Sequence, residues 1–189
     1  MFTSDLNQVS KILRTGGIAI FPTDTVWGMG CSAKSDQAIT KFYQIKQREA
    51  SKPTAILVNS LKMAQEYGEL TVQALSLAEK HWPGALTIIV KAKSSVPRAI
   101  AGENGTVGLR FPDFTVTQQL IAQLSCGLVT GSANFAGEPS PTEREQLNPE
   151  LLKKVDIVLD GECGHQPPST VADCSGGDFK VLRQGLVSL

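Results

Sequence analysis

Short apolar runs of strand length alternate along this chain with segments of helical period, and this alternation limits the fold more than any other feature. The run Ile18–Phe21 is apolar at every position, as in a strand buried on both faces, and Pro22 ends it. Further strands are expected at 54–58, 86–90, 106–109, 128–130, 155–159, 170–173 and 180–182. Helices are expected between them, at 6–13, 36–45, 61–67, 72–81, 116–124 and 143–152. The alternation predicts one α/β domain over residues 1–189, with a mixed sheet and flanking helices.

The composition agrees with a single folded domain. The chain has 189 residues, enough for a full hydrophobic core, and 41% of them are hydrophobic. Lysine plus arginine and aspartate plus glutamate both number 18, so the net charge is zero and a bulk electrostatic attraction to nucleic acid is not indicated. The N-terminus lacks a signal-peptide pattern and no apolar run approaches the ~20 residues of a membrane span. We therefore expect a soluble, cytoplasmic protein with no membrane contact.

The cysteines and histidines do not predict a metal site. Cys163, His165 and Cys174 are the residues nearest to such a cluster, and their spacing matches no zinc pattern. The four cysteines include no C-x-x-C pair, which is typical of reduced cysteines in a cytosolic protein. The chain also lacks a P-loop, an H-E-x-x-H helix and a Ser/His/Asp order, so covalent and zinc-dependent catalysis have little support.

Seven short motifs each join a conformationally special residue to a polar or cationic one. They are 21–28 (FPTDTVWG), 46–48 (KQR), 82–87 (WPGALT), 109–112 (LRFP), 131–134 (GSAN), 169–173 (STVAD) and 182–185 (LRQG). Most follow an expected strand, and in open α/β sheets the strand ends form the ligand crevice. They supply cations, hydroxyls and an amide, from Lys46, Arg48, Arg110, Arg183, Thr25, Ser132, Asn134 and Ser169. This set suits an anionic ligand rich in oxygen atoms.

Lys46 and Arg48 lie two residues apart at an expected helix end. On a continuous helix their side chains would diverge, and they can converge into an anion clamp only if the helix stops near Ile45. The alternative is a solvated helix end whose cations offset the helix dipole.

Arg110 follows an apolar strand, and a buried guanidinium is costly without an anion. Its partner could be a ligand or a protein carboxylate, and the same alternatives hold for Arg183. Ser132 and Asn134 share one face of an extended segment, where they could bind a ligand or simply form the turn that ends the strand.

Taken together and in this order, the motifs resemble those of the YrdC family, the TsaC-type threonylcarbamoyl-AMP synthases. The resemblance extends from about residue 17 to residue 185 and includes K-x-R at 46–48 and S-x-N at 132–134. The chain departs from the usual family pattern at Glu49, Ala85 and Gly131, where relatives often carry proline, or threonine at the last position.

The resemblance implies a twisted, mostly open sheet with a large basic concave cavity. It also implies a nucleotidyltransferase reaction in which L-threonine, bicarbonate or CO2, and ATP give threonylcarbamoyl-AMP and pyrophosphate. Mg²⁺ would accompany the triphosphate. The product would serve threonylcarbamoyladenosine formation in tRNA, by way of a downstream threonylcarbamoyl-transferase complex.

By the same resemblance, Lys46 and Arg48 are the catalytic residues. The threonine pocket would be lined by Thr25, Arg110, Thr130 and Ser169. ATP would be contacted by Arg48, Lys52, Thr106, Ser132, Asn134, Ser140 and Arg183. Three alternatives stay open: a double-stranded RNA-binding or ribosome maturation factor of the same family, a paralogue of different activity, and a carbamoyl-transfer domain like that of hydrogenase maturation proteins.

Overall fold

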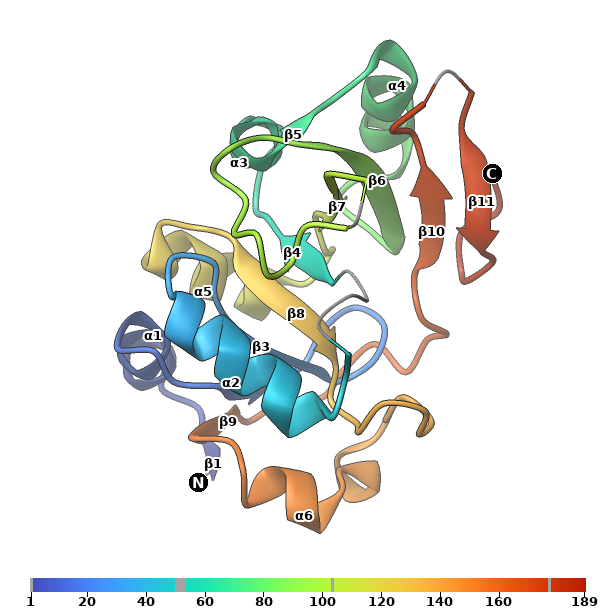
Figure 1. Ribbon diagram of the computed structural model, residues 1–189. Coiled ribbons are helices and arrows are strands. Elements are labelled where there is room, and N and C mark those ends of the chain that lie inside the picture. Colours follow the sequence, from blue (N-terminus) through green and yellow to red (C-terminus); the bar gives the residue numbers. More distant parts are fainter. Residues whose placement is uncertain (1, 50–53, 103, 177) are drawn as a thin grey trace.

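The computed structural model describes residues 2–49, 54–102, 104–176 and 178–189 of the protein. Within these residues, eleven strands form one sheet (Figure 1). The strands are β1 (Phe2–Thr3), β2 (Ala19–Phe21), β3 (Gly28–Ser32), β4 (Ala55–Leu57), β5 (Gly68–Glu69), β6 (Leu86–Ala92), β7 (Thr106–Arg110), β8 (Leu128–Ser132), β9 (Ile157–Leu159), β10 (Thr170–Asp173) and β11 (Lys180–Arg183). The helices are α1 (Leu6–Arg14), α2 (Asp36–Lys46), α3 (Leu61–Tyr67), α4 (Val72–His81), α5 (Thr115–Leu124), the 3-10 turn η1 (Arg144–Gln146) and α6 (Pro149–Leu152).

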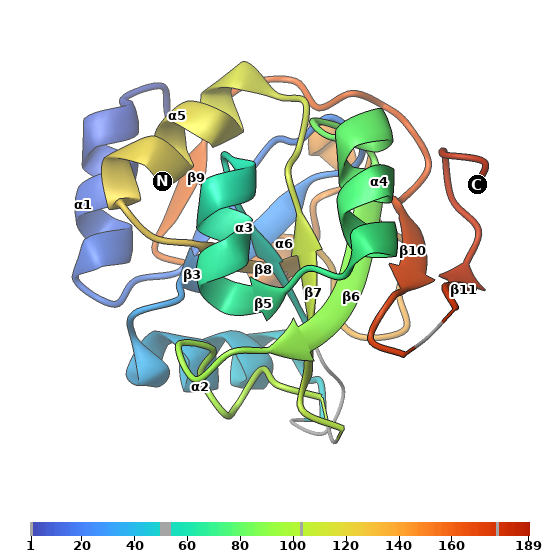
Figure 2. The same cartoon turned by 90° about the horizontal axis from the view of Figure 1, so that it is seen from above.

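The sheet is mixed and open, as the alternation of strands and helices predicts. Its strands are ordered β1-β9-β2-β3-β8-β4-β7-β6-β10-β11, and β5 pairs with β6 outside this path. Four pairs are parallel: β9 with β1, β9 with β2, β4 with β7, and β6 with β10. The other described pairs are antiparallel. Figure 2 shows α1 and α5 side by side at one end, α4 beside β6, and α2 on the opposite side of the sheet from α5.

The continuous apolar run around β2 is buried because both of its faces carry helices. Ala19 and Phe21 pack in a cluster with residues of α1 and α5. Ile18 and Ile20 point the other way and pack in a larger cluster with α2. All four side chains are fully buried, which accounts for the absence of polar alternation in this segment.

Strand β3 is missing from the sequence-based expectation, which has no strand between residues 21 and 54. Glycines weaken strand propensity, so this segment carries no strand signal. The structure explains why glycine is needed here, because a Cβ on Gly30 would lie 2.2 Å from the carbonyl oxygen of Val129 on β8. The ring of Phe21 packs over both glycines of β3, Gly28 and Gly30. β3 is therefore packed closely against its two neighbours, β2 and β8.

The continuous helix expected at 143–152 is wrong. The chain instead forms the short turn η1 and then α6, with Leu147 and Asn148 between them. Pro149 has no N–H to donate and is tolerated only at a helix start. The side chain of Asn148 accepts a hydrogen bond from the N–H of Glu150 at 2.9 Å and caps the new helix.

The tight contact at Gly30 predicts a large effect of one methyl group. Gly30→Ala should destabilise the protein by about 1–3 kcal/mol, because the added Cβ would force β3 away from β8. Urea unfolding would measure the shift. Gly176→Ala is the matched control, since a Cβ there meets no atom within 4 Å. Equal unfolding midpoints for the two variants would contradict the close approach of β3 and β8.

Candidate active site

A cavity of about 320 Å³ lies on one face of the sheet. Alternate residues of neighbouring strands form its floor, because residues two apart on a strand share a face. Thr106, Gly108 and Arg110 come from β7, and Ala55 of β4 and Ile89 of β6 pair with Gly108 on either side. The cavity is within the size range of small-molecule sites.

Positive charge dominates the lining of this cavity. Lys46, Arg48, Arg110 and Arg183 all contribute to it, whereas no aspartate or glutamate of the described residues does. Burial lowers the pKa of the Arg183 guanidinium, and the nearby charges of Arg110 and Arg48 lower it further. A cavity with one sign of charge attracts anions although the whole chain is neutral.

Arg110 ends β7 and is 7% exposed. Its Nη2 pairs with Asp24 Oδ1 at 2.6 Å, its Nη1 donates to Thr25 Oγ1 at 3.1 Å, and its Nε donates to a backbone carbonyl oxygen. A protein carboxylate is therefore one partner of the buried guanidinium. A guanidinium has five N–H groups, so these three bonds leave two N–H groups for a ligand among the contacts described.

The segment that carries Asp24 and Thr25 is fixed from behind by residues just before β10. The N–H of Gly164 donates to Thr23 O at 2.8 Å, and the N–H of Gln166 donates to Thr25 O at 3.1 Å. A Cβ on Gly164 would lie 2.1 Å from Asp24 O, so only glycine allows this approach. Thr23 and Thr25 both line the cavity, because residues two apart in an extended segment point the same way.

The end of α2 decides between the two interpretations of Lys46 and Arg48. The helix stops at Lys46, and Gln47 adopts a left-handed conformation with φ 52°. This turn brings both cations to the cavity, and Lys46 is only 3% exposed. The solvated helix end is therefore wrong for Lys46.

The ammonium of Lys46 meets the S-x-N segment. Its Nζ donates to Asn134 Oδ1 at 2.8 Å, to Asn134 O at 3.1 Å and to Ser132 O at 2.5 Å. Burial and the charge of Arg48 lower the pKa of Lys46 to about 8. Asn134 lies behind the lining residues, whereas Ser132 is one of them.

Arg183 and Ser169 form a second polar group across the cavity. Arg183 Nη2 donates to Ser169 O at 2.8 Å and to Ser169 Oγ at 3.2 Å. The Ser169 hydroxyl also lies 2.9 Å from the hydroxyl of Thr87 on β6. Thr87 was not expected as a site residue, although it is the last residue of the WPGALT motif and shares its strand face with Ile89.

The structure thus brings most of the expected site residues together. The lining includes Thr25, Lys46, Arg48, Thr106, Arg110, Thr130, Ser132, Ser140, Ser169 and Arg183. Asn134 supports the lining from behind, and Lys52 lies outside the described residues. Besides Thr87, the lining threonine Thr54 was missed, because an isolated hydroxyl has no sequence signal of its own.

The histidines, cysteines and acidic residues form no metal centre in the part of the chain that the structure describes. No cluster of three histidine, cysteine or acidic side chains there could hold a metal ion. Cys163 instead donates its thiol hydrogen to Thr142 O at 2.6 Å, and burial raises its pKa. No helix within the described ranges is long and apolar enough to cross a membrane.

Comparison with known proteins agrees with the geometry. A putative threonylcarbamoyl-AMP synthase of Methanocaldococcus jannaschii is 35% identical over 186 residues, which cover 97% of this chain and 87% of that protein. The threonylcarbamoyl-AMP synthase of Xanthomonas campestris pv. campestris is 31% identical over 96% of this chain and 98% of that protein. The enzyme of that name from Bacillus subtilis is 33% identical over 94% of this chain, but the match covers 52% of the longer protein.

Solved structures share the fold. Sua5 of P. abyssi complexed with L-threonine superposes with a TM-score of 0.90 and 31% identity, over 95% of this chain and 54% of that one. YciO of E. coli superposes with a TM-score of 0.89 and 26% identity, over 100% of this chain and 95% of that one. The Sua5/YciO/YrdC family model, described as "Telomere recombination", matches residues 11–185. The chain therefore belongs to the Sua5/YciO/YrdC family.

Proposed function

We propose that the protein is an L-threonylcarbamoyladenylate synthase, which makes threonylcarbamoyl-AMP and pyrophosphate from L-threonine, bicarbonate or CO2, and ATP. One observation carries the proposal: a single cavity gathers four cations and a ring of hydroxyls from separate motifs, with no carboxylate in its described lining. Relatives named threonylcarbamoyl-AMP synthase match 94–97% of this chain. The site and the relatives point to the same class of anionic substrate.

The threonine subsite would lie around Arg110. The two N–H groups of Arg110 that have no described protein partner suit a substrate carboxylate. The pair with Asp24 fixes the guanidinium before the substrate arrives, which reduces the ordering cost of binding. Hydroxyls of Thr25, Thr130 and Ser169 line the same cavity and can bind the amino and hydroxyl groups of threonine.

The ATP subsite would use Arg48 and Arg183, with hydroxyls from Thr106, Ser132 and Ser140. Guanidinium groups match phosphate oxygens in geometry and charge. Lys52 and Asn134 are expected there too by family resemblance.

Mg²⁺ prefers oxygen ligands, and the described lining offers hydroxyls but no carboxylate. The described lining thus provides no carboxylate site for the ion, which would enter on the triphosphate of ATP.

The chemistry needs positioning and charge neutralisation more than a protein nucleophile. The ammonium group of threonine loses one proton to solvent, and the resulting amine adds to CO2. Loss of a second proton to solvent gives a carbamate that keeps one N–H. A carbamate oxygen then bonds to the α-phosphorus of ATP as the bond to the bridging oxygen breaks, and pyrophosphate leaves with the electron pair. Cations around the cavity would offset the negative charge of both reactants, which otherwise repel each other.

The place of the reaction in the cell is part of the proposal. The mixed anhydride would pass to a transferase that modifies tRNA, in the cytoplasm. The RNA-binding alternative gains no support, because the convergent cations line a cavity of about 320 Å³ and the chain has no net positive charge.

Pyrophosphate release tests the function directly. The purified protein should release pyrophosphate from ATP only when L-threonine and bicarbonate are both present. Inorganic phosphate as the product, or turnover that does not depend on threonine, would exclude the synthase.

Arg110→Lys tests the assignment of the threonine subsite. Lysine keeps the charge but loses the planar donor fork, so the KM for threonine should rise by about 10–100-fold while the KM for ATP changes much less. Arg144→Lys is the matched control, since Arg144 pairs with Asp160 at 2.8 Å outside the cavity. If the KM for ATP rises and the KM for threonine does not, Arg110 belongs to the nucleotide subsite.

A further inference from the structure

Lys46 uses its hydrogen-bonding capacity within the protein. An ammonium has three N–H donors and no acceptor. Its three shortest contacts, to Ser132 O, Asn134 O and Asn134 Oδ1, are all protein oxygens. A fourth oxygen, Ser132 Oγ, lies at 3.4 Å, the limit of a hydrogen bond. With 3% of the residue exposed, little of the ammonium can meet a ligand.

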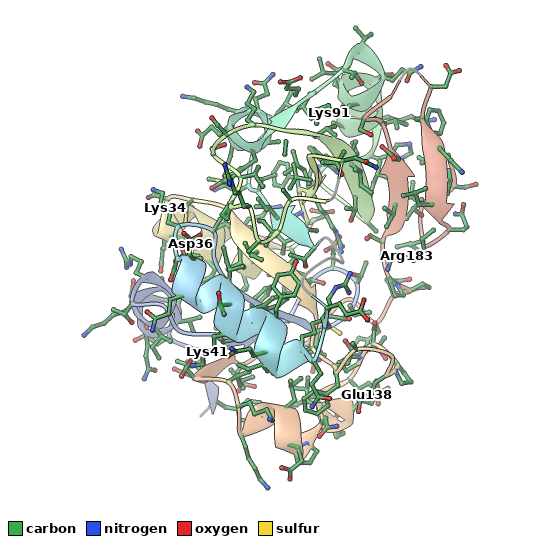
Figure 3. All side chains as sticks on the ribbon, in the orientation of Figure 1. Lys34, Asp36, Lys41, Lys91, Glu138 and Arg183 are labelled. Atoms are coloured by element: carbon green, nitrogen blue, oxygen red, sulfur yellow. The ribbon has the colours of Figure 1, made fainter. Side chains whose placement is uncertain are left out.

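Lys46 also binds the loop that follows β8, through its backbone carbonyl group. The carbonyl oxygen of Lys46 accepts from the N–H of Ala136 at 2.9 Å. Asn134, which receives the ammonium, donates its amide N–H to Glu138 O and accepts from the Ser132 hydroxyl at 2.6 Å. Figure 3 shows Glu138 in the loop beyond the end of α2, with Lys41 midway along that helix. Lys46 is thus the centre of a closed network that shapes the segment 132–138.

We propose that Lys46 is a positioning residue, which holds the segment 132–138 so that the Ser132 hydroxyl and Arg48 face the ligand, and that it does not itself bind phosphate. This rests on the proposed function for the identity of the ligand, but the network itself does not. It differs from the expectations that Lys46 and Arg48 form an anion clamp and that Asn134 contacts ATP. The K-x-R and S-x-N motifs then have divided roles. Lys46 reaches the cavity lining but donates its hydrogen bonds to Ser132 and Asn134, whereas Arg48 and Ser132 are the lining residues that would contact the ligand.

The physical basis is the cost of burying a charge. An ammonium that loses its acceptors inside a protein is strongly destabilising, so the segment and the charge depend on each other. The pKa of about 8 leaves the ammonium charged at neutral pH, which is the form that three acceptors require. The stem of Lys46 also packs against Gly131, where a Cβ would lie 3.0 Å from Lys46 Cε.

Amide hydrogen exchange of the nucleotide-free protein tests this role. Lys46→Met keeps the length of the stem and removes the charge, and it should speed exchange in the segment 132–138 by about tenfold or more. Lys41→Met, which removes an ion pair with Asp156 from the same helix, should leave that segment unchanged. Unchanged exchange in Lys46→Met would overturn the proposal. Since no nucleotide is present, this result is independent of whether the protein is a synthase.

A double-mutant cycle separates positioning from direct phosphate contact. If Lys46 and Asn134 act through their mutual bond, Lys46→Met combined with Asn134→Ala should lower kcat/KM for ATP no further than the worse single variant. If the fold-losses in kcat/KM of the two single variants multiply in the double variant, each side chain contacts the nucleotide on its own, and the proposal is overturned.

A measurement on the unmodified protein also tests the proposal and does not require that a variant folds. The NMR signal of the Lys46 ammonium should be protected from rapid hydrogen exchange without nucleotide, and it should keep that protection and nearly the same shift when ATP is added. Rapid exchange in the free protein, or a large shift on adding ATP, would overturn the proposal.

Discussion

Buried positive charge is the constraint on which the concave side of this protein depends. Lys46 and Arg110 are almost completely buried, and each would be costly without partners. Their partners come from distant parts of the chain: Ser132 and Asn134 for the ammonium, and Asp24 and Thr25 for the guanidinium. The motifs are therefore physically coupled, because the position of each cation is set by another motif. Arg48 and Arg183 complete the positive lining, which a bound anion would compensate.

The sheet provides the frame that makes this coupling possible. Pairing of β4 and β6 with β7 places Ala55 and Ile89 on either side of Gly108, so no side chain projects from β7 at that point of the cavity floor. β8 pairs with β3 and β4, which carries Thr130 and Ser132 to the same face. The glycines of β3 let its two neighbours, β2 and β8, approach it closely. Function thus depends on register, since a slip of one residue would turn the polar side chains away from the cavity.

The sequence predicts those features that a single residue or a local period can report. The apolar run at Ile18–Phe21 predicts a buried strand, and the cost of burying Arg110 predicts an anionic partner, which the structure supplies in part as Asp24. Features that depend on strand pairing leave no such local pattern in the sequence. β3 lacks a strand signal because its glycines are required by the close contact with Val129, which lies on another strand. The turn at Gln47 and the enclosure of Lys46 by Asn134 likewise depend on a segment about ninety residues away, so the sequence left two interpretations open.

A crystal structure of the protein with L-threonine and a non-hydrolysable ATP analogue would test the central claim most directly, because that claim concerns which charges remain for the substrates. The account predicts the threonine carboxylate on the two remaining N–H groups of Arg110 and the triphosphate on Arg48, Arg183 and the Ser132 hydroxyl. It also predicts that the Lys46 ammonium stays on Ser132 O and Asn134. A triphosphate bound directly to Lys46, or ligands outside this cavity, would contradict it.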